Sequence, residues 1–153
     1  MKPNVYSQLL VQIVFATKYR EHFLKKEFRI EVWKYMCKTI TNLGHKCLIV
    51  NGVEDHVHLL VGMKPFMSVS DLVKEIKRSS TDFINDNNWT RKPFRWQGGY
   101  GVFSYNMSHL NIIYNYIANQ EEHHSKKSFK NEYLELLKSF DIKFEDQYLF
   151  EWI

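Results

Sequence analysis

The stretch EDHVHLLV at residues 54–61 decides how the rest of the chain is interpreted. Its alternation predicts a β-strand with one entirely aliphatic face. His56 and His58 share the other face, because side chains two apart in a strand point the same way. Two neighbouring imidazoles on a rigid strand can supply two nitrogen ligands to one divalent metal ion. The remaining ligands would then have to come from elsewhere in the chain.

Length and composition favour one globular domain. The chain has 153 residues, of which 44% are hydrophobic and 16% aromatic. This composition excludes a disordered chain, and the length allows a sizeable core. No repeat or linker divides the sequence, so we expect a single domain over residues 1–153. No apolar run reaches the roughly 18 residues of a membrane span, and the first residues lack the apolar stretch of a signal peptide.

Charge and cysteine usage indicate the kind of partner and compartment. The net charge is +4, which favours a polyanionic partner without identifying it. Cys37 and Cys47 are the only two cysteines and form no motif. We therefore expect reduced thiols in a cytoplasmic protein.

The hydrophobic pattern alternates between the periods of strands and helices. We expect strands over residues 6–17, 46–53, 56–61 and, with a glycine distortion, 94–103, and helices over 25–43, from Ser68 or Ser70 to 85, from Ser108 to 121–124, and over 129–140. This order is the split β-α-β pattern of ferredoxin-like folds. The predicted fold class is therefore α+β: an antiparallel sheet with helices on one face and an additional C-terminal helix that bears a tyrosine. Such a sheet hosts many activities and does not decide the function.

The hairpin before the histidine strand can be placed in two ways. Asn51-Gly52 is the stronger turn dipeptide by propensity. A turn at Glu54-Asp55 instead leaves two longer strands and puts the histidines near the start of the second. We prefer this second placement, with Asn51-Gly52 as a bulge.

Two protein ligands make an incomplete metal site, so a third donor is needed. Tyr116 and Gln120 are four residues apart and share one face of the helix that begins at Ser108. Packed on the sheet, this helix could place the Gln120 carbonyl oxygen on the metal and the Tyr116 hydroxyl beside it. Tyr114 is the rival tyrosine, but it lies about 240° around the helix from Gln120. Ordinary surface positions would explain the same residues, so the helix alone does not decide.

Three motifs taken together resemble the IS200/IS605-type transposases. These are single-tyrosine members of the HUH endonuclease superfamily and include the REP-associated tyrosine transposases. The motifs are HVH at residues 56–58, WQGGYG at 96–101 and YIANQEEHH at 116–124. The resemblance covers essentially the whole chain, from VFATKYR at 14–20 onward. The histidine motif combined with the tyrosine-to-glutamine spacing is specific, whereas either alone is not.

The resemblance implies a chemistry and a set of residues for it. His56, His58 and Gln120 would hold a divalent metal, Mg²⁺ or Mn²⁺, and Tyr116 would be the nucleophile. Its attack on DNA leaves a 5′-phosphotyrosine and a free 3′-hydroxyl, while the ion neutralises charge on the phosphate. Strands can then be rejoined without ATP. The resemblance also implies single-stranded DNA with hairpin ends, a homodimer with active sites shared between chains, and a bacterial or archaeal cell.

Several further residues are candidates for supporting roles. Asp55 would hydrogen-bond a ligand histidine or serve simply as a turn residue. His123 and His124 are interpreted as supporting or DNA-contacting residues, with surface histidines as the alternative. The candidates for phosphate contacts, held as a group, are Lys18, Arg20, Lys74, Lys77, Arg78, Arg91, Lys92 and Arg95.

Two other functions fit parts of the sequence. A catalytically inactive relative that binds DNA or RNA hairpins would keep the same fold, although all four proposed catalytic positions are intact. A histidine-triad nucleotide hydrolase would need a third alternate histidine, but the flanking positions on that face are Glu54 and Leu60. The sequence therefore predicts a metal-dependent transposase that nicks and joins single-stranded DNA.

Overall fold

The computed structural model describes residues 4–18 and 23–152. Along the chain the elements are β1 (Leu10–Ala16), α1 (Lys26–Asn42), β2 (Lys46–Gly52), β3 (His56–Gly62), α2 (Val69–Asp86), β4 (Gly101–Tyr105), the 3₁₀ helix η2 (Met107–His109), α3 (Leu110–Ala118), α4 (Gln120–His124), α5 (Phe129–Ser139) and the 3₁₀ helix η3 (Asp146–Tyr148). Within the described ranges, none of these helices combines the length and the apolar character that a membrane crossing requires.

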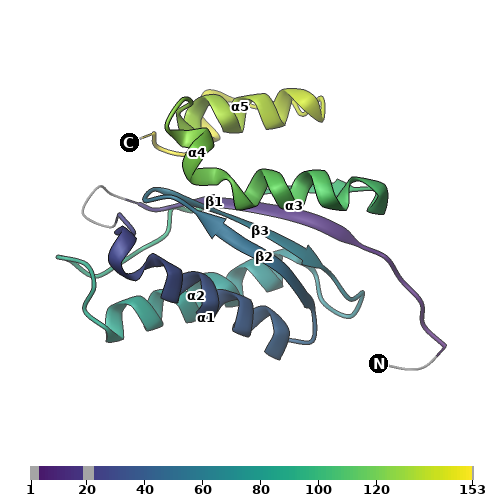
Figure 1. Ribbon diagram of the computed structural model, residues 1–153, viewed down its shortest axis with the longest axis horizontal. Helices are drawn as coiled ribbons and strands as arrows, with labels where there is room; N and C mark the ends of the chain where they lie inside the picture. The colour runs from purple at the N-terminus through teal and green to yellow at the C-terminus, as the bar shows by residue number, and fades with distance from the viewer. Residues whose placement is uncertain (1–3, 19–22, 153) are drawn as a thin grey trace.

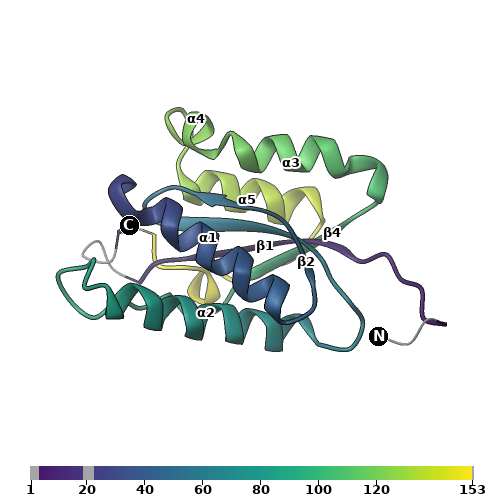
Figure 2. The ribbon, with the colours of Figure 1, turned by 60° about the horizontal axis from the view of Figure 1, so that its bottom comes forward.

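The four strands form one antiparallel sheet in the order β2-β3-β1-β4. α1 and α2 cover one face of the sheet, and α3, α4 and α5 cover the other (Figure 1). Figure 2 shows the same layers from a second direction, with α3 and α5 side by side over the sheet. This is the ferredoxin-like arrangement that the order of elements predicts, with the tyrosine-bearing helix α3 added after the last strand. The predicted fold class is confirmed.

The side chains of β3 are buried on both faces of the sheet. The side chains of residues 57, 59 and 61 are completely buried in the main core beneath α1 and α2. His56 and His58 point to the opposite face and are also completely buried. β1 lies between β3 and β4 and is covered on both faces, which is why it is apolar almost throughout.

The turn between β2 and β3 lies at the second of the two predicted positions. β2 and β3 are joined at residues 53–55, where the Val53 N–H donates to the His56 carbonyl oxygen over 3.2 Å. The predicted turn at Glu54-Asp55 is confirmed.

The predicted bulge at Asn51-Gly52 is wrong. Gly52 pairs with Val57 in the ladder, and the register shift lies between Cys47 and Ile49 instead. A Cβ atom on residue 52 would overlap the His56 carbonyl oxygen. Gly52 therefore permits close pairing of the two strands. A glycine within a strand often marks either a bulge or such a close approach of backbones, and here it marks the close approach.

The helices that cover the first face begin and end close to their predicted bounds. Ser68, and not Ser70, caps α2, because its Oγ accepts a hydrogen bond from the Asp71 N–H over 3.1 Å. This satisfies one of the N–H groups that a helix start leaves without a partner.

The aromatic segment 94–103 is a strand only at its end. Regular pairing starts at Gly101, and before it the segment contacts the sheet through a bridge at Trp96. The Trp96 indole N–H donates to Ser80 Oγ over 3.0 Å, and Lys77 Nζ donates to two carbonyl oxygens of the segment at 2.8 and 2.7 Å. The predicted strand with a glycine distortion is confirmed in part: the segment is interrupted around Gly98 and Gly99, and regular pairing is limited to β4, because side chains of α2 hold the part before Gly101 in place of a ladder.

The helix predicted to run from Ser108 to 121–124 is broken in two. Asn119 separates α3 from α4, with φ −101° and ψ 23°. The Asn51 side chain on β2 donates Nδ2–H to the last two carbonyl oxygens of α3, at 2.9 and 3.2 Å. These bonds satisfy carbonyl groups that the end of a helix leaves without partners, so the chain can change direction before Gln120.

The expectation of reduced thiols is wrong. Cys37 on α1 and Cys47 on β2 form a disulfide, with Cα atoms 5.5 Å apart. α1 reverses into β2 at Gly44, whose φ of 94° suits glycine. This tight reversal brings the two cysteines within the reach of a disulfide, which a count of cysteines does not reveal.

Candidate active site

The two histidines of β3 lie on a rigid part of the sheet. β3 is an inner strand, paired with β1 over its whole length and with β2 from Val57 to Gly62. His56 and His58 are completely buried, with ring centroids 5.2 Å apart. The strand therefore presents both imidazoles to the α3–α5 face, as the alternation predicts.

The tyrosine helix brings the other two predicted residues to these rings. Gln120, the first residue of α4, is completely buried and places its Oε1 3.2 Å from His56 Nε2. The Tyr116 ring lies 5.9 Å from the His58 ring, centroid to centroid. Tyr114, the rival nucleophile, is 42% exposed. The structure therefore brings His56, His58, Gln120 and Tyr116 together in one chain.

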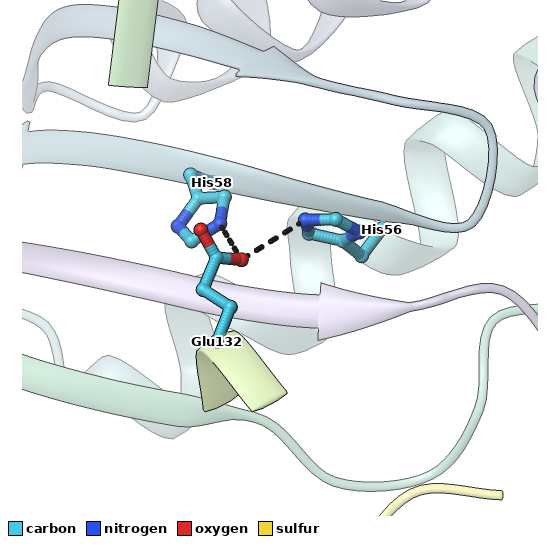
Figure 3. A group of neighbouring side chains, drawn as sticks. All are labelled: His56, His58 and Glu132. Carbon is cyan, nitrogen blue, oxygen red and sulfur yellow. Dashed lines mark hydrogen bonds and ion pairs between the residues drawn. The ribbon is translucent and has the colours of Figure 1, made fainter. Parts of the chain in front are cut away.

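Glu132 on α5 contacts all four of these side chains, and the sequence did not predict it. One carboxylate oxygen lies 3.2 Å from His56 Nε2 and 3.0 Å from His58 Nε2 (Figure 3). The other accepts hydrogen bonds from the Tyr116 hydroxyl and, over 3.1 Å, from Gln120 Nε2. Glu132 is 2% exposed, so a buried carboxylate forms the centre of the cluster.

His124 also belongs to the cluster. Its Nε2 lies 3.0 Å from the same Glu132 oxygen that faces the other two imidazoles, and its ring centroid is 4.4 Å from that of His56. Its supporting position agrees with one of the two interpretations of the sequence. His123 is exposed and stacks on the Tyr116 ring, with centroids 4.8 Å apart.

A weak sequence signal for Glu132 does exist. On α5 the buried positions are Phe129, Glu132, Tyr133 and Leu137. A carboxylate in the middle of an aromatic and aliphatic stripe is unusual, because an ionised carboxylate is rarely buried without partners. The signal identifies a buried acid but not its partners, of which His58 is 74 residues away in the sequence and His56 lies two residues further.

Side chains behind the histidines fix the ring orientations. Asp55 Oδ1 accepts a hydrogen bond from His56 Nδ1 over 2.7 Å, so Asp55 is both a turn residue and a histidine partner. The Gln12 amide lies 2.9 Å from His58 Nδ1 and in turn accepts a bond from the Tyr105 hydroxyl over 2.6 Å. Both imidazoles are thereby held with Nε2 directed at Glu132. The bond from His56 Nδ1 to Asp55 is of the kind that orients ligand histidines in metal sites.

The charges of the cluster follow from these contacts. Burial lowers the pKa of His56, but the hydrogen bonds and charges of Asp55 and Glu132 outweigh it and raise the pKa to about 9. Burial lowers the pKa of His58, which the Glu132 carboxylate offsets only in part. Burial raises the pKa of Glu132, but the charge of His58 and the imidazole hydrogen bonds bring it well below its usual range. Glu132 is therefore a buried anion surrounded by imidazoles.

The pKa of Tyr116 is raised above its ordinary value. Burial is the largest cause, followed by the negative charge of Glu132 and the hydrogen bond to it. The phenol therefore stays protonated at neutral pH, with its proton directed at the carboxylate.

The donor atoms of the cluster fit a divalent ion. The ligand atoms of His56, His58 and Glu132 all lie within 4.8 Å of one another. Neighbouring donors in a six-coordinate site with bonds of about 2.1 Å are about 3.0 Å apart. The contacts among these donors and Gln120 Oε1 are 3.0–3.2 Å. The residues therefore fit a metal ion, with Glu132 added to the three predicted ligands.

Solvent reaches the tyrosine through a pocket between α4 and α5. Its volume is about 740 Å³, and its lining includes Tyr116, Asn119, His123 and Lys126. Tyr116 is half-buried, so its inner side contacts the cluster while its outer side faces this pocket.

The basic candidates for phosphate contacts divide into two groups. Lys74, Lys77 and Arg78 lie on α2, across the sheet from the cluster (Figure 1). The Lys77 ammonium donates to two carbonyl oxygens, and burial lowers its pKa to about 8. Arg78 contacts Glu75 over 2.8 Å. These side chains therefore belong to the helical layer on the far side of the sheet from the histidines.

The second group lies at the end of the sheet that carries the histidines. The Lys18 N–H donates to the Arg95 carbonyl oxygen over 3.0 Å, and the N–H of the preceding residue, Thr17, donates to the Asp55 carbonyl oxygen over 2.9 Å. Arg91 and Lys92 are exposed in the loop that leads to Arg95. Arg20 lies outside the described residues.

The prediction that two chains share their active sites stays a prediction. Within one chain, the described residues already include both histidines, the glutamine and the tyrosine of the cluster, together with Glu132.

Comparison with known proteins gives a family and two similar folds. The family model described as "Transposase IS200 like" matches residues 5–120. No curated protein matches the chain. A crystal structure of a Deinococcus radiodurans R1 protein proposed to be a transposase is 24% identical, with a TM-score of 0.60 over 78% of this chain and 96% of that one. A REP-associated tyrosine transposase bound to a REP hairpin is 14% identical, with a TM-score of 0.59 over 81% of this chain and 73% of that one.

Proposed function

Because the chain belongs to the IS200-like transposase family, we propose that it cuts and rejoins single-stranded DNA through a covalent bond to Tyr116. The observation that carries this proposal is the convergence of the Tyr116 hydroxyl, the Gln120 amide and the His56–His58 pair on the Glu132 carboxylate. A nucleophile beside a set of metal donors is the arrangement that a phosphoryl transfer needs.

The residues that would hold the ion are His56, His58, Gln120 and Glu132. When bound, Mg²⁺ or Mn²⁺ neutralises the charge that builds up on the phosphate oxygens. Imidazole suits transition metals, while carboxylate and amide oxygens suit Mg²⁺ and Mn²⁺. This mixed donor set therefore suits Mg²⁺ or Mn²⁺ through its oxygens and does not by itself select one ion.

Tyr116 supplies the covalent chemistry. As its oxygen bonds to phosphorus, the bond from phosphorus to the 3′ oxygen breaks, and the 3′ oxygen takes up a proton. The hydrogen bond to Glu132 orients the phenolic oxygen, and the phenolic proton passes to solvent in the pocket that Tyr116 lines. The 5′-phosphotyrosine keeps the energy of the broken bond, so a 3′-hydroxyl can reverse the step and join two strands.

The proposed substrate is a single strand whose ends fold into hairpins. A solved structure of similar fold is a REP-associated tyrosine transposase bound to a REP hairpin. The basic side chains at the histidine end of the sheet, Lys18, Arg91, Lys92 and Arg95, are the proposed contacts for its phosphates.

A trapping assay tests this function. The protein is incubated with Mn²⁺ and a labelled single strand carrying a hairpin end from the DNA beside its gene, and covalent products are separated on a denaturing gel. We expect an adduct from the wild type, none from Tyr116→Phe, and near wild-type amounts from the matched control Tyr114→Phe. An adduct that survives Tyr116→Phe contradicts the assignment. Tight hairpin binding with no adduct favours the inactive hairpin-binding alternative.

A further inference from the structure

A second hollow adjoins the tyrosine pocket and continues along α5. The pocket that Tyr116 lines has Lys126, Lys127 and Glu135 in its wall. The same three side chains line a neighbouring pocket of about 500 Å³, which we call the α5 groove. The other residues that line the groove are Ser128, Asn131, Leu134, Lys138 and Phe144. Only exposed side chains therefore lie between the nucleophile's pocket and the groove.

The groove leads away from the histidines. Near its start, Ser128 lines a small pocket together with Asp55 and His124. From there α5 runs away from the end of the sheet where β2 meets β3 (Figure 1). The stretch from Ser128 to Lys138 is about 15 Å long at 1.5 Å per residue. Stacked nucleotides of one strand are about 3.4 Å apart, so the length of the groove matches about four of them.

The lysines of the groove give it a positive charge. Lys126 and Lys138 are exposed, and neither makes an ion pair within residues 4–18 and 23–152. Lys127 Nζ lies 2.6 Å from Glu135 Oε2, the one carboxylate among the described residues that line the groove. Three ammonium groups against one carboxylate suit a ligand that carries phosphates. The tyrosine pocket, by contrast, is lined by both signs of charge.

The groove also offers an apolar surface to bases. The Phe144 side chain is 46% exposed, and the half-buried Leu134 lines the same groove. Proteins that hold single strands without sequence preference combine these two features. Aromatic rings stack on the bases, and basic side chains follow the phosphates. The α5 groove has both, and it adjoins the pocket of a proposed DNA nucleophile.

From these features we propose that the α5 groove binds the DNA strand that stays attached to Tyr116 after the cut. The cut leaves the 5′-phosphate on the tyrosine, so the attached strand is the one that continues 3′ of the cut. Its phosphates contact Lys126 and Lys138, and a base stacks on Phe144. The inference rests on the proposed function for the identity of this strand. None of the groove's lysines is among the phosphate contacts proposed at the histidine end of the sheet.

The groove gives the attached strand a place to stay between cutting and joining. A strand held only by its bond to Tyr116 would move freely in solvent. A strand that also lies along α5 keeps its first nucleotides beside the site until a 3′-hydroxyl arrives.

Binding without cleavage tests the groove. The probe is a fluorescein-labelled deoxythymidine single strand of about 15 nucleotides, and anisotropy measures its Kd without metal ion at several salt concentrations. We expect Lys126→Ala and Lys138→Ala each to lower the slope of log Kd against log salt by about 0.7. Phe144→Ala should weaken binding about fivefold or more. The matched control Lys38→Ala, which removes an exposed lysine from α1, should keep the wild-type slope and affinity.

Two results of this measurement overturn the inference. One is a wild-type slope in both Lys126→Ala and Lys138→Ala. The other is an equal fall of the slope in Lys38→Ala, because the attraction would then belong to the whole surface and not to the groove.

Cross-linking tests which strand the groove holds. The strand of the trapping assay carries 5-iododeoxyuridine a few nucleotides 3′ of the cut. The adduct formed with Mn²⁺ is irradiated, digested with protease and analysed by mass spectrometry. We expect the second attachment on Phe144, and a cross-link confined to the loop that holds Arg91 and Lys92 overturns the inference. Absence of any adduct from the wild type counts against the proposed function, whereas the deoxythymidine measurement needs no cut and still decides whether the groove binds a single strand.

Discussion

The two faces of the sheet bury their side chains by different means. On the face covered by α1 and α2, Val57, Leu59 and Val61 are held by apolar contact alone. On the other face, the same strand buries two imidazoles, and each needs a polar partner on both of its nitrogens. Apolar burial depends on volume, whereas buried polar groups depend on every partner being present. The aliphatic side chains of β3 are therefore held by volume, and its two histidines by their polar partners.

The largest expected effect on stability concerns the apolar face. Leu59→Ala removes a completely buried side chain from the main core, and such substitutions cost about 2–5 kcal/mol of unfolding free energy. Urea unfolding followed by circular dichroism measures the loss. The rate of adduct formation in the folded fraction should stay at the wild-type level. A selective loss of activity would show that the two faces are not independent.

In metal-free protein, the contribution of the histidine face to the free energy of unfolding should depend on pH. The pKa of His56 is raised to about 9 from 6.5, so the folded state keeps a proton that the unfolded state releases. This contribution is complete below pH 6.5 and is lost as the pH rises to 9, by up to about 3 kcal/mol. Urea unfolding in EDTA at pH 6.5 and 9 measures it. Asp55→Asn, which removes one cause of the shift, should reduce the difference; an unchanged difference contradicts the assignment to His56.

Metal binding should raise the free energy of unfolding only when the histidines of the polar face are present. Mn²⁺ at one hundred times its dissociation constant should raise the unfolding free energy of the wild type by about 2.7 kcal/mol. Leu59→Ala should gain the same increment from its lower baseline, whereas His58→Ala should gain much less. Thermal unfolding with and without Mn²⁺ measures the increments. Equal increments in His58→Ala and wild type would place the ion elsewhere.

The smallest expected effect concerns the helix start on the apolar face. Ser68→Ala removes the cap of α2 and should cost about 1 kcal/mol. Ser70→Ala, a matched change inside the helix, should cost less. Equal losses would show that the hydrogen bond to Asp71 N–H is not what starts α2.

Local patterns predicted much of this molecule. Alternation over residues 54–61 placed both histidines on one face, and helical spacing paired Tyr116 with Gln120. Each inference needs only a short window of sequence. The fold class followed because the order of elements in this chain corresponds to a well-populated topology.

The remainder depends on contacts between distant residues. Glu132 contacts His58, which is 74 residues away in the sequence, and no residue near Glu132 in the sequence indicates this partner. The break at Asn119 depends on Asn51 across the sheet, and the disulfide depends on how tightly α1 reverses into β2. These features belong to packing, which periodicity does not describe.

The central claim is that Tyr116 is the nucleophile of a site built around His56 and His58. Mass spectrometry of the trapped protein–DNA adduct, digested with protease and nuclease, tests it most directly. The account predicts that the nucleotide remnant is attached to Tyr116. A remnant on Tyr114 or on any other residue would contradict it.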